Sequence, residues 1–232
     1  MDNKKNFIYW GIGTLLLLCI MIYPNIVYAI INNSGITYVI TSIIFALPLI
    51  GLVCILPRKW MYCVATILLT IMSIIDLTMI DLYKDYLLPG GIISTIKTNP
   101  QEAAEFYKTN LNEVFRWIPL IVCCVLGCCL YQTRSKLIPN IIILATSLLI
   151  PSVFVFGKVV GSYDSKITFR YYIDHRIWNR TPYNVVFQSV NTVKELNKRK
   201  YIEHTSQISF GAKRTTTTSQ KEVYIFAIGE SL

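Results

Sequence analysis

The sequence predicts an α-helical membrane protein with five transmembrane helices and interfacial helices, followed by the first β-strand of a truncated α/β domain. Hydrophobic residues make up 53% of the 232 residues and charged residues only 15%, a balance outside the usual range of soluble domains. Five apolar stretches of membrane-spanning length are separated by polar segments. Near the end, Val223–Ile228 is a short run rich in β-branched and aromatic residues, typical of a strand buried on both faces.

The five apolar stretches define a transmembrane domain over residues 1–157. The first follows Lys4 and Lys5 and continues to residue 31 without a charge, which is longer than the apolar core of a signal peptide. Residues 158–220 are expected to form an interfacial and helical linker, and residues 221–232 to begin the next domain. The predicted spans are residues 7–31, 36–56, 60–83, 114–131 and 137–157.

Basic residues in the short loops predict the orientation of these spans. The pairs Lys4–Lys5, Arg58–Lys59 and Arg134–Lys136 all fall on the same side of the predicted membrane domain. By the positive-inside rule this side is cytoplasmic. The loop 84–113 and the carboxyl-terminal tail are therefore expected on the outer side.

The net charge of +9 is concentrated in the tail. From Lys158 onward there are twelve Lys/Arg and six Asp/Glu, which leaves +6 of the total. This balance suits contact with anionic lipid head groups, and a solvated basic linker is the alternative interpretation. Nucleic acid is not an expected partner, because the basic and aromatic residues match no recognition module.

All seven cysteines lie inside apolar segments, so the sequence implies no disulfide framework. We interpret them as small, polarizable residues that pack helices together. Cys123 and Gly127 are four residues apart and share one helix face, which predicts close approach of another helix. The cysteines are Cys19, Cys54, Cys63, Cys123, Cys124, Cys128 and Cys129.

Two acidic residues fall at apparent membrane depth, Asp76 and Asp81 in the third span. Acids within a membrane segment are candidates for a functional role. Both are within about two turns of the outer end of the span. We therefore expect them at the membrane–water boundary, with a functional role as the alternative.

A helix is predicted after Asn179, in the linker. Thr181 is the expected cap and Pro182 the first-turn proline, and the helical pattern continues to about Tyr201.

The outer loop holds a second candidate site. After the breaker Pro89-Gly90-Gly91, the apolar spacing predicts short amphipathic helices at the interface. A carboxylate beside a hydroxyl, as at Glu102 and Thr98, can receive an ammonium group. The same residues also suit a helix start at Pro100 capped by Thr98 or Asn99, and both interpretations stay open.

Two motifs resemble those of the lipid phosphoethanolamine transferases, membrane members of the alkaline phosphatase and sulfatase superfamily. One is the strand that ends in Gly229-Glu230-Ser231 after a five-span domain. The other is the segment 94–103, similar to the family's Asn-x-x-x-Thr-x-x-x-Glu-Ala motif, with Ser94 in place of the asparagine. The resemblance implies that Glu230 binds Zn²⁺ and that Ser94, Thr98 and Glu102 line the site for the donor head group.

The resemblance also implies an activity: transfer of phosphoethanolamine from a phospholipid donor to lipid A or another surface glycolipid. The enzyme would lie in the bacterial inner membrane, with a cytoplasmic amino terminus and a periplasmic carboxyl terminus. A zinc-activated threonine forms the phosphoenzyme intermediate in this family. That threonine and most metal ligands are expected downstream in the sulfatase-like domain, so we expect the chain as given to be inactive.

Two other functions remain as alternatives. One is a glycerol-phosphate polymerase resembling lipoteichoic acid synthases, which share five spans and a similar strand followed by Glu-Ser. The other is a non-enzymatic five-span membrane protein that pairs its last strand with a partner chain.

Overall fold

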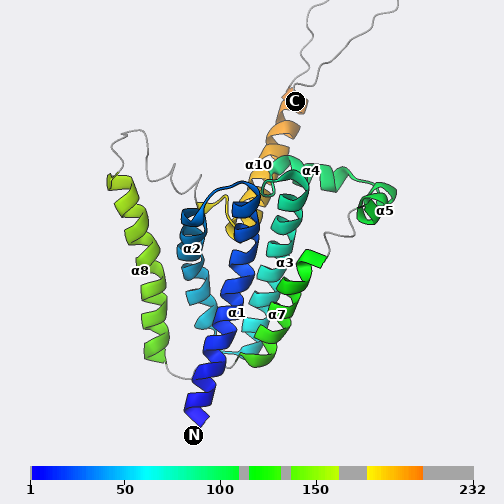
Figure 1. Cartoon of the computed structure of the whole chain (residues 1–232). Coiled ribbons are helices and arrows are strands. Elements are labelled where there is room, and N and C mark those ends of the chain that lie inside the picture. The colour runs from blue at the N-terminus through cyan, green and yellow to red at the C-terminus, as the bar shows by residue number, and fades with distance from the viewer. Residues whose placement is uncertain (1, 110–114, 132–136, 162–176, 206–232) are drawn as a thin grey trace, which may run out of the picture. The chain divides into compact units, whose positions relative to one another are not determined.

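The computed structural model describes residues 2–109, 115–131, 137–161 and 177–205, and this part of the chain is helical (Figure 1). The predicted strand 223–228 lies outside these residues. Two units are distinguished, Met1–Lys194 and Glu195–Leu232. The elements are α1 (Asp2–Ile31), α2 (Ile36–Cys54), α3 (Lys59–Tyr83), α4 (Pro89–Lys97), α5 (Pro100–Thr109), the 3₁₀ helix η1 (Phe115–Trp117), α7 (Ile118–Leu130), α8 (Leu137–Gly161) and α10 (Tyr183–Thr205).

Three helices are long and apolar enough to cross a membrane, which indicates a membrane protein. They are α1 over Asn6–Ile31, α2 and α3, and they match the first three predicted spans. Within the described residues the other two predicted spans are represented by shorter apolar helical stretches, Phe115–Leu130 and Ile143–Lys158.

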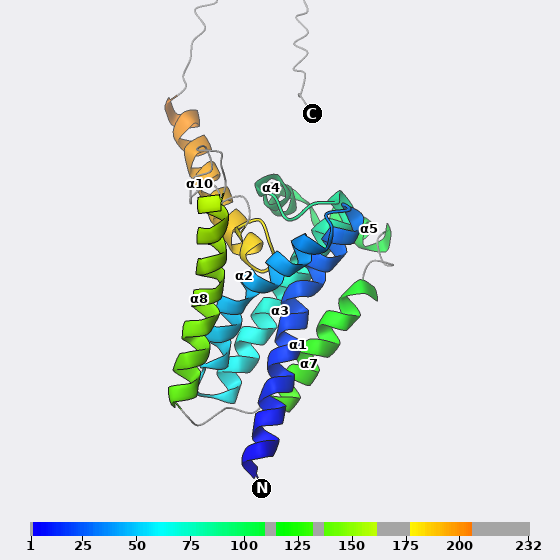
Figure 2. The ribbon, with the colours of Figure 1, turned by 60° about the vertical axis from the view of Figure 1, so that its left-hand side comes forward.

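Helix α1 lies at the centre of the first unit. It packs against α2, α3 and α7, while α3 also packs against α7 and α8 packs along α2 (Figures 1 and 2). Buried apolar side chains fill the contacts in two clusters, one around Leu17, Met21 and Tyr62, the other around Ile20, Leu77 and Leu120. The two clusters thus join α1, α2, α3 and α7 through apolar contacts.

Small residues allow α1, α3 and α7 to approach closely. The rings of Tyr62 and Tyr131 stack with centroids 3.6 Å apart, and the Tyr62 hydroxyl donates to the Gly13 carbonyl at 2.8 Å. A Cβ added at Gly127 would lie 3.3 Å from the Tyr62 hydroxyl. The close approach predicted at Gly127 is therefore confirmed. On the same helix, the partly buried Cys123 packs against the cluster around Ile20.

Helix α8 meets α2 at an equally tight point. A Cβ added at Gly51 would lie 2.0 Å from Ser147 Oγ, so only glycine fits there. One and a half turns earlier on α2, the Phe45 ring packs edge-on against Phe154 of α8 with centroids 6.0 Å apart. These contacts fix where α8 lies along α2.

Some helix ends differ from the prediction by a few residues. Helix α2 ends at Cys54 and α8 continues to Gly161. The fourth apolar stretch begins with a 3₁₀ turn, and its α-helix starts only at Ile118. Proline in the first turn explains that start, because Pro119 has no N–H to donate and its fixed φ suits the beginning of a helix.

Candidate functional site

The Asp76 carboxylate is buried inside the protein. Its side chain on α3 has no exposed surface, and Asp81 is only 7% exposed, so the expectation that water reaches both acids is wrong, while their location at the membrane–water boundary stays a prediction. The Thr181 hydroxyl donates to Asp76 Oδ2 at 2.7 Å, and Asn184 Nδ2 donates to Oδ1 at 2.9 Å. These partners are more than 100 residues away in the sequence, which is why local spacing did not reveal them.

Asp81 is also bound within the protein. Its carboxylate forms an ion pair with Arg116 of η1. This pair joins the carboxyl-terminal end of α3 to the start of the fourth apolar stretch. Both acids of the third span therefore have partners that come from later segments.

The turn before α10 is held by the buried Arg180, which is 4% exposed. Its Nη1 donates to the Tyr38 carbonyl at 3.0 Å and to Ser42 Oγ at 2.9 Å, and also contacts Thr41 Oγ1. The guanidinium lies 4.0 Å from the centre of the Tyr38 ring. Arg180 therefore brings a positive charge to the first turn of α2, a role that sequence reasoning missed.

Thr181 has a different role from the predicted helix cap. Helix α10 starts at Tyr183, and the Thr181 hydroxyl donates to Asp76. A cap would use the hydroxyl oxygen as an acceptor for a backbone N–H, whereas here the hydroxyl acts as a donor to a charged acceptor on α3. The helix itself forms as predicted and continues to Thr205.

A chain of hydrogen bonds runs from α2 to the same turn. Asn25 Nδ2 donates to the carbonyls of Met21 and Thr181, so its Oδ1 is left to accept from the Tyr86 hydroxyl at 2.6 Å. Because Tyr86 gives its only hydroxyl proton to Asn25, the Tyr38 hydroxyl is the donor in the 2.8 Å contact between the two phenols. Burial raises the pKa of Tyr86 well above its ordinary value, which keeps it protonated as this chain requires.

A second chain, which we call the amide chain, consists of Asn179, Asn184 and Gln188. Gln188 Nε2 donates to Asn179 Oδ1 at 3.3 Å and to Asn184 Oδ1 at 3.4 Å. Asn184 Nδ2 in turn donates to Asp76 and to the Leu87 carbonyl. The amide chain therefore ends on the buried carboxylate.

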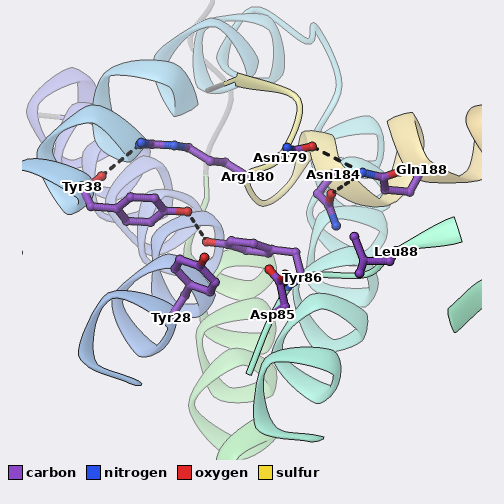
Figure 3. Close-up of a pocket in the computed structure, with 9 residues that line it drawn as sticks. All are labelled: Tyr28, Tyr38, Asp85, Tyr86, Leu88, Asn179, Arg180, Asn184 and Gln188. Carbon is purple, nitrogen blue, oxygen red and sulfur yellow. Dashed lines mark hydrogen bonds between the residues drawn. The ribbon is translucent and has the colours of Figure 1, made fainter. Parts of the chain in front are cut away.

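These two chains surround a pocket of about 300 Å³ (Figure 3). It lies where α1 and α3 end and α2 begins, and its lining carries both signs of charge. Arg180 contributes the cation, and the exposed Asp85, whose Oδ1 accepts from the Tyr86 N–H at 2.8 Å, contributes the anion. The lining residues are Tyr28, Tyr38, Asp85, Tyr86, Leu88, Asn179, Arg180, Asn184 and Gln188.

The predicted head-group residues Ser94, Thr98 and Glu102 lie at the α4–α5 junction and are exposed. They are not in the pocket lining, although α4 starts directly after the lining residue Leu88. The Thr98 hydroxyl donates to the Ser94 carbonyl at 2.8 Å. Asn99 Oδ1 accepts from the Glu102 N–H at 2.8 Å while Glu102 Oε2 faces the Asn99 N–H at 3.4 Å, the arrangement of a capping box.

The expected metal ligand Glu230 lies outside the described residues. Among the residues that are described, no group of three or more His, Cys, Asp or Glu side chains could hold a metal ion. The seven cysteines are free thiols.

No protein-family model, curated protein or solved structure matches this chain at a significant level.

Proposed function

We propose that this chain is the membrane-embedded part of an enzyme that transfers phosphoethanolamine from a phospholipid to lipid A or another surface glycolipid. The observation that carries the proposal is the pocket at the end of three membrane-length helices, with Arg180 and Asp85 in one lining. A phosphoethanolamine head group carries one negative phosphate and one positive ammonium, so a site with both charges suits it.

The chemistry of the lining supports a specific placement of such a head group. The phosphate would lie toward Arg180 and Asn179, which offer a positive charge and an amide. The ammonium would lie toward the Asp85 carboxylate and the half-buried ring of Tyr28. A volume of about 300 Å³ is at the lower end of ligand pockets and suits a head group more than a whole lipid.

The wider architecture follows from the sequence. In the proposal η1–α7 and α8 complete five spans, and the pocket opens on the outer face of the bacterial inner membrane, opposite the side on which the positive-inside rule predicts the basic loops. Ser94, Thr98 and Glu102 would form a second polar surface for the donor next to α4. Zn²⁺ is proposed only from the resemblance at Glu230, and no step is assigned to it.

The Asp85 carboxylate favours this function over glycerol-phosphate polymerisation. A growing glycerol-phosphate chain is anionic and has no ammonium, so a carboxylate in the lining would repel it. An ethanolamine head group would instead gain a charge-assisted hydrogen bond there.

A transfer assay tests the proposal. The full-length gene product in vesicles is given phosphatidylethanolamine labelled in its ethanolamine, together with lipid A, and labelled lipid A is the expected product. Asp85→Asn should raise KM for the donor about tenfold with a smaller effect on kcat, because it weakens binding of the ammonium. Glu195→Gln removes an exposed acid on α10 and is the matched control. Transfer of glycerol phosphate from phosphatidylglycerol at an equal rate would contradict the proposed substrate.

A further inference from the structure

We propose that Asn179 is a phosphate-binding residue of the pocket: its side-chain Nδ2 binds a phosphate oxygen of the head group, and the amide chain sets its orientation. The inference rests on the proposed function of the pocket as a head-group site. It assigns Asn179 as the contact and Gln188, Asn184 and Asp76 as positioning residues that act through it.

The orientation begins at Asn184. Its Nδ2 lies between two groups that can only accept, the Asp76 carboxylate at 2.9 Å and the Leu87 carbonyl at 3.1 Å. An amide nitrogen has two hydrogens, and both are used here. Asn184 is 1% exposed, so water does not compete. Its Oδ1 must therefore point the other way, toward Gln188.

The orientation of Asn184 in turn fixes the orientation of the Gln188 amide. An oxygen at Asn184 requires a donor opposite it, so Gln188 presents Nε2, at 3.4 Å. The second hydrogen of this nitrogen goes to Asn179 Oδ1 at 3.3 Å. Gln188 is 6% exposed, which makes the opposite orientation, two oxygens facing each other without water, costly.

The result is a donor at the pocket. Because Asn179 Oδ1 is held by Gln188, its Nδ2 is turned away from Gln188 and toward the side of Arg180 (Figure 3). Asn179 is exposed, and within the described residues its Nδ2 makes no hydrogen bond. A donor amide in a lining that also carries the Arg180 cation suits an anionic oxygen, whereas a turned amide would present a repelling oxygen.

Binding of short-chain phosphatidylethanolamine and phosphatidylglycerol to the full chain in non-ionic detergent tests this assignment by calorimetry. Asn179→Asp replaces the donor with a carboxylate of the same shape and should weaken both lipids about tenfold or more, because both carry the phosphate. Ser73→Ala, a buried change on α3 outside the pocket lining, is the control and should bind as wild type.

A double-mutant cycle tests whether Gln188 acts through Asn179. Gln188→Met keeps the volume but releases Asn179, and should weaken both lipids several-fold. Once Asn179 is replaced by alanine, adding Gln188→Met should cause no further loss of affinity. Additive losses would show an independent structural role for Gln188 and would overturn the positioning claim.

The charge on Asp76 has a separate test. Asp76→Asn keeps an oxygen for Asn184 and can donate to the Thr181 hydroxyl, so it should bind both lipids within about twofold of wild type. Asp76→Leu removes the acceptor and should weaken binding. An equal loss of lipid affinity in both variants would mean that binding depends on the charge of Asp76 and not on the orientation of the amide chain.

The outcomes separate this inference from the proposed function. If the wild-type chain binds neither lipid, the pocket is no head-group site and both proposals fail. If it binds phosphatidylethanolamine and Asn179→Asp binds equally well, only the assignment of Asn179 is overturned. Displacement of the lipid by an equal concentration of inorganic phosphate would identify a free anion as the ligand. That result would also overturn the assignment of Asn179 as a contact to the lipid head group.

Discussion

The Thr181 hydroxyl donates a 2.7 Å hydrogen bond to the buried Asp76 carboxylate, although 105 residues separate the two in the sequence. This bond joins α3 to the turn that carries Arg180 and leads into α10. Asn184, one turn into that region, donates to the other oxygen of the same carboxylate. The position of the pocket residues on this turn therefore depends on one acidic side chain of a membrane-length helix.

Removal of the Asp76 acceptor should destabilise the protein strongly. Asp76→Leu leaves the buried Thr181 hydroxyl without its acceptor and removes one of the two acceptors of the Asn184 amide nitrogen. It should therefore lower the free energy of unfolding by about 3 kcal/mol. Asp76→Asn, which preserves both contacts, should cost about 1 kcal/mol or less. The measurement is chemical denaturation in detergent, and equal costs for the two variants would contradict the hydrogen-bond account.

The α2–α8 contact predicts a steric effect at Gly51. A Cβ there would lie 2.0 Å from Ser147 Oγ, so Gly51→Ala should lower stability by about 2 kcal/mol through overpacking. Adding Ser147→Gly should restore most of the loss. Gly157→Ala, where a Cβ meets nothing within 4 Å, is the control, and a loss as large at Gly157 would point to a backbone effect instead.

The capping box and the proposed ligand role of Glu102 can be separated. Glu102→Gln keeps the side-chain oxygen that caps α5 but removes the charge, so α5 should persist while donor transfer falls about tenfold. Asn99→Ala removes the cap, worth about 1 kcal/mol, and should lower hydrogen-exchange protection of the Glu102 amide. Wild-type transfer by Glu102→Gln would leave the cap as the role of this residue.

Burial of the Tyr183 hydroxyl should make the stability of the protein depend on alkaline pH. Burial raises its pKa from 10.0 to about 12, and its hydroxyl donates to the Phe45 carbonyl at 2.8 Å. Between these two values the unfolded chain has lost this proton and the folded chain retains it, so stability falls as pH rises from about 10 to about 12.

Tyr183→Phe should therefore lose less stability than wild type across that pH range, as measured by thermal unfolding. Tyr83→Phe changes a tyrosine that is 64% exposed and is the matched control. A steeper loss in Tyr183→Phe than in wild type would contradict the assignment.

The helices could be predicted from the sequence more fully than the site. Long and mostly apolar runs predicted α1, α2 and α3, because length and composition alone decide whether a helix suits a membrane. The spacing of Cys123 and Gly127 predicted a close helix contact, because two small residues four apart share one helix face. These predictions needed no knowledge of which segments meet.

The pocket could not be predicted because its partners are distant in sequence. Asp76 looked accessible near the end of a span, and Thr181 looked like a cap, since each was judged from its own neighbours. One local pattern did exist. Asn184, Gln188 and Thr192 recur every fourth residue on α10, and all three are buried, so a polar stripe marked the face that packs on the bundle.

The preference for phosphatidylethanolamine over phosphatidylglycerol shows whether the pocket recognises both charges of the head group. The full chain in detergent is titrated with short-chain forms of both lipids, in wild type, Asp85→Asn and the control Glu195→Gln. The account predicts that wild type and the control bind phosphatidylethanolamine about tenfold more tightly, and that Asp85→Asn loses this preference. Equal binding of the two lipids by wild type, or a preference that survives in Asp85→Asn, would contradict a pocket that recognises both charges of the head group.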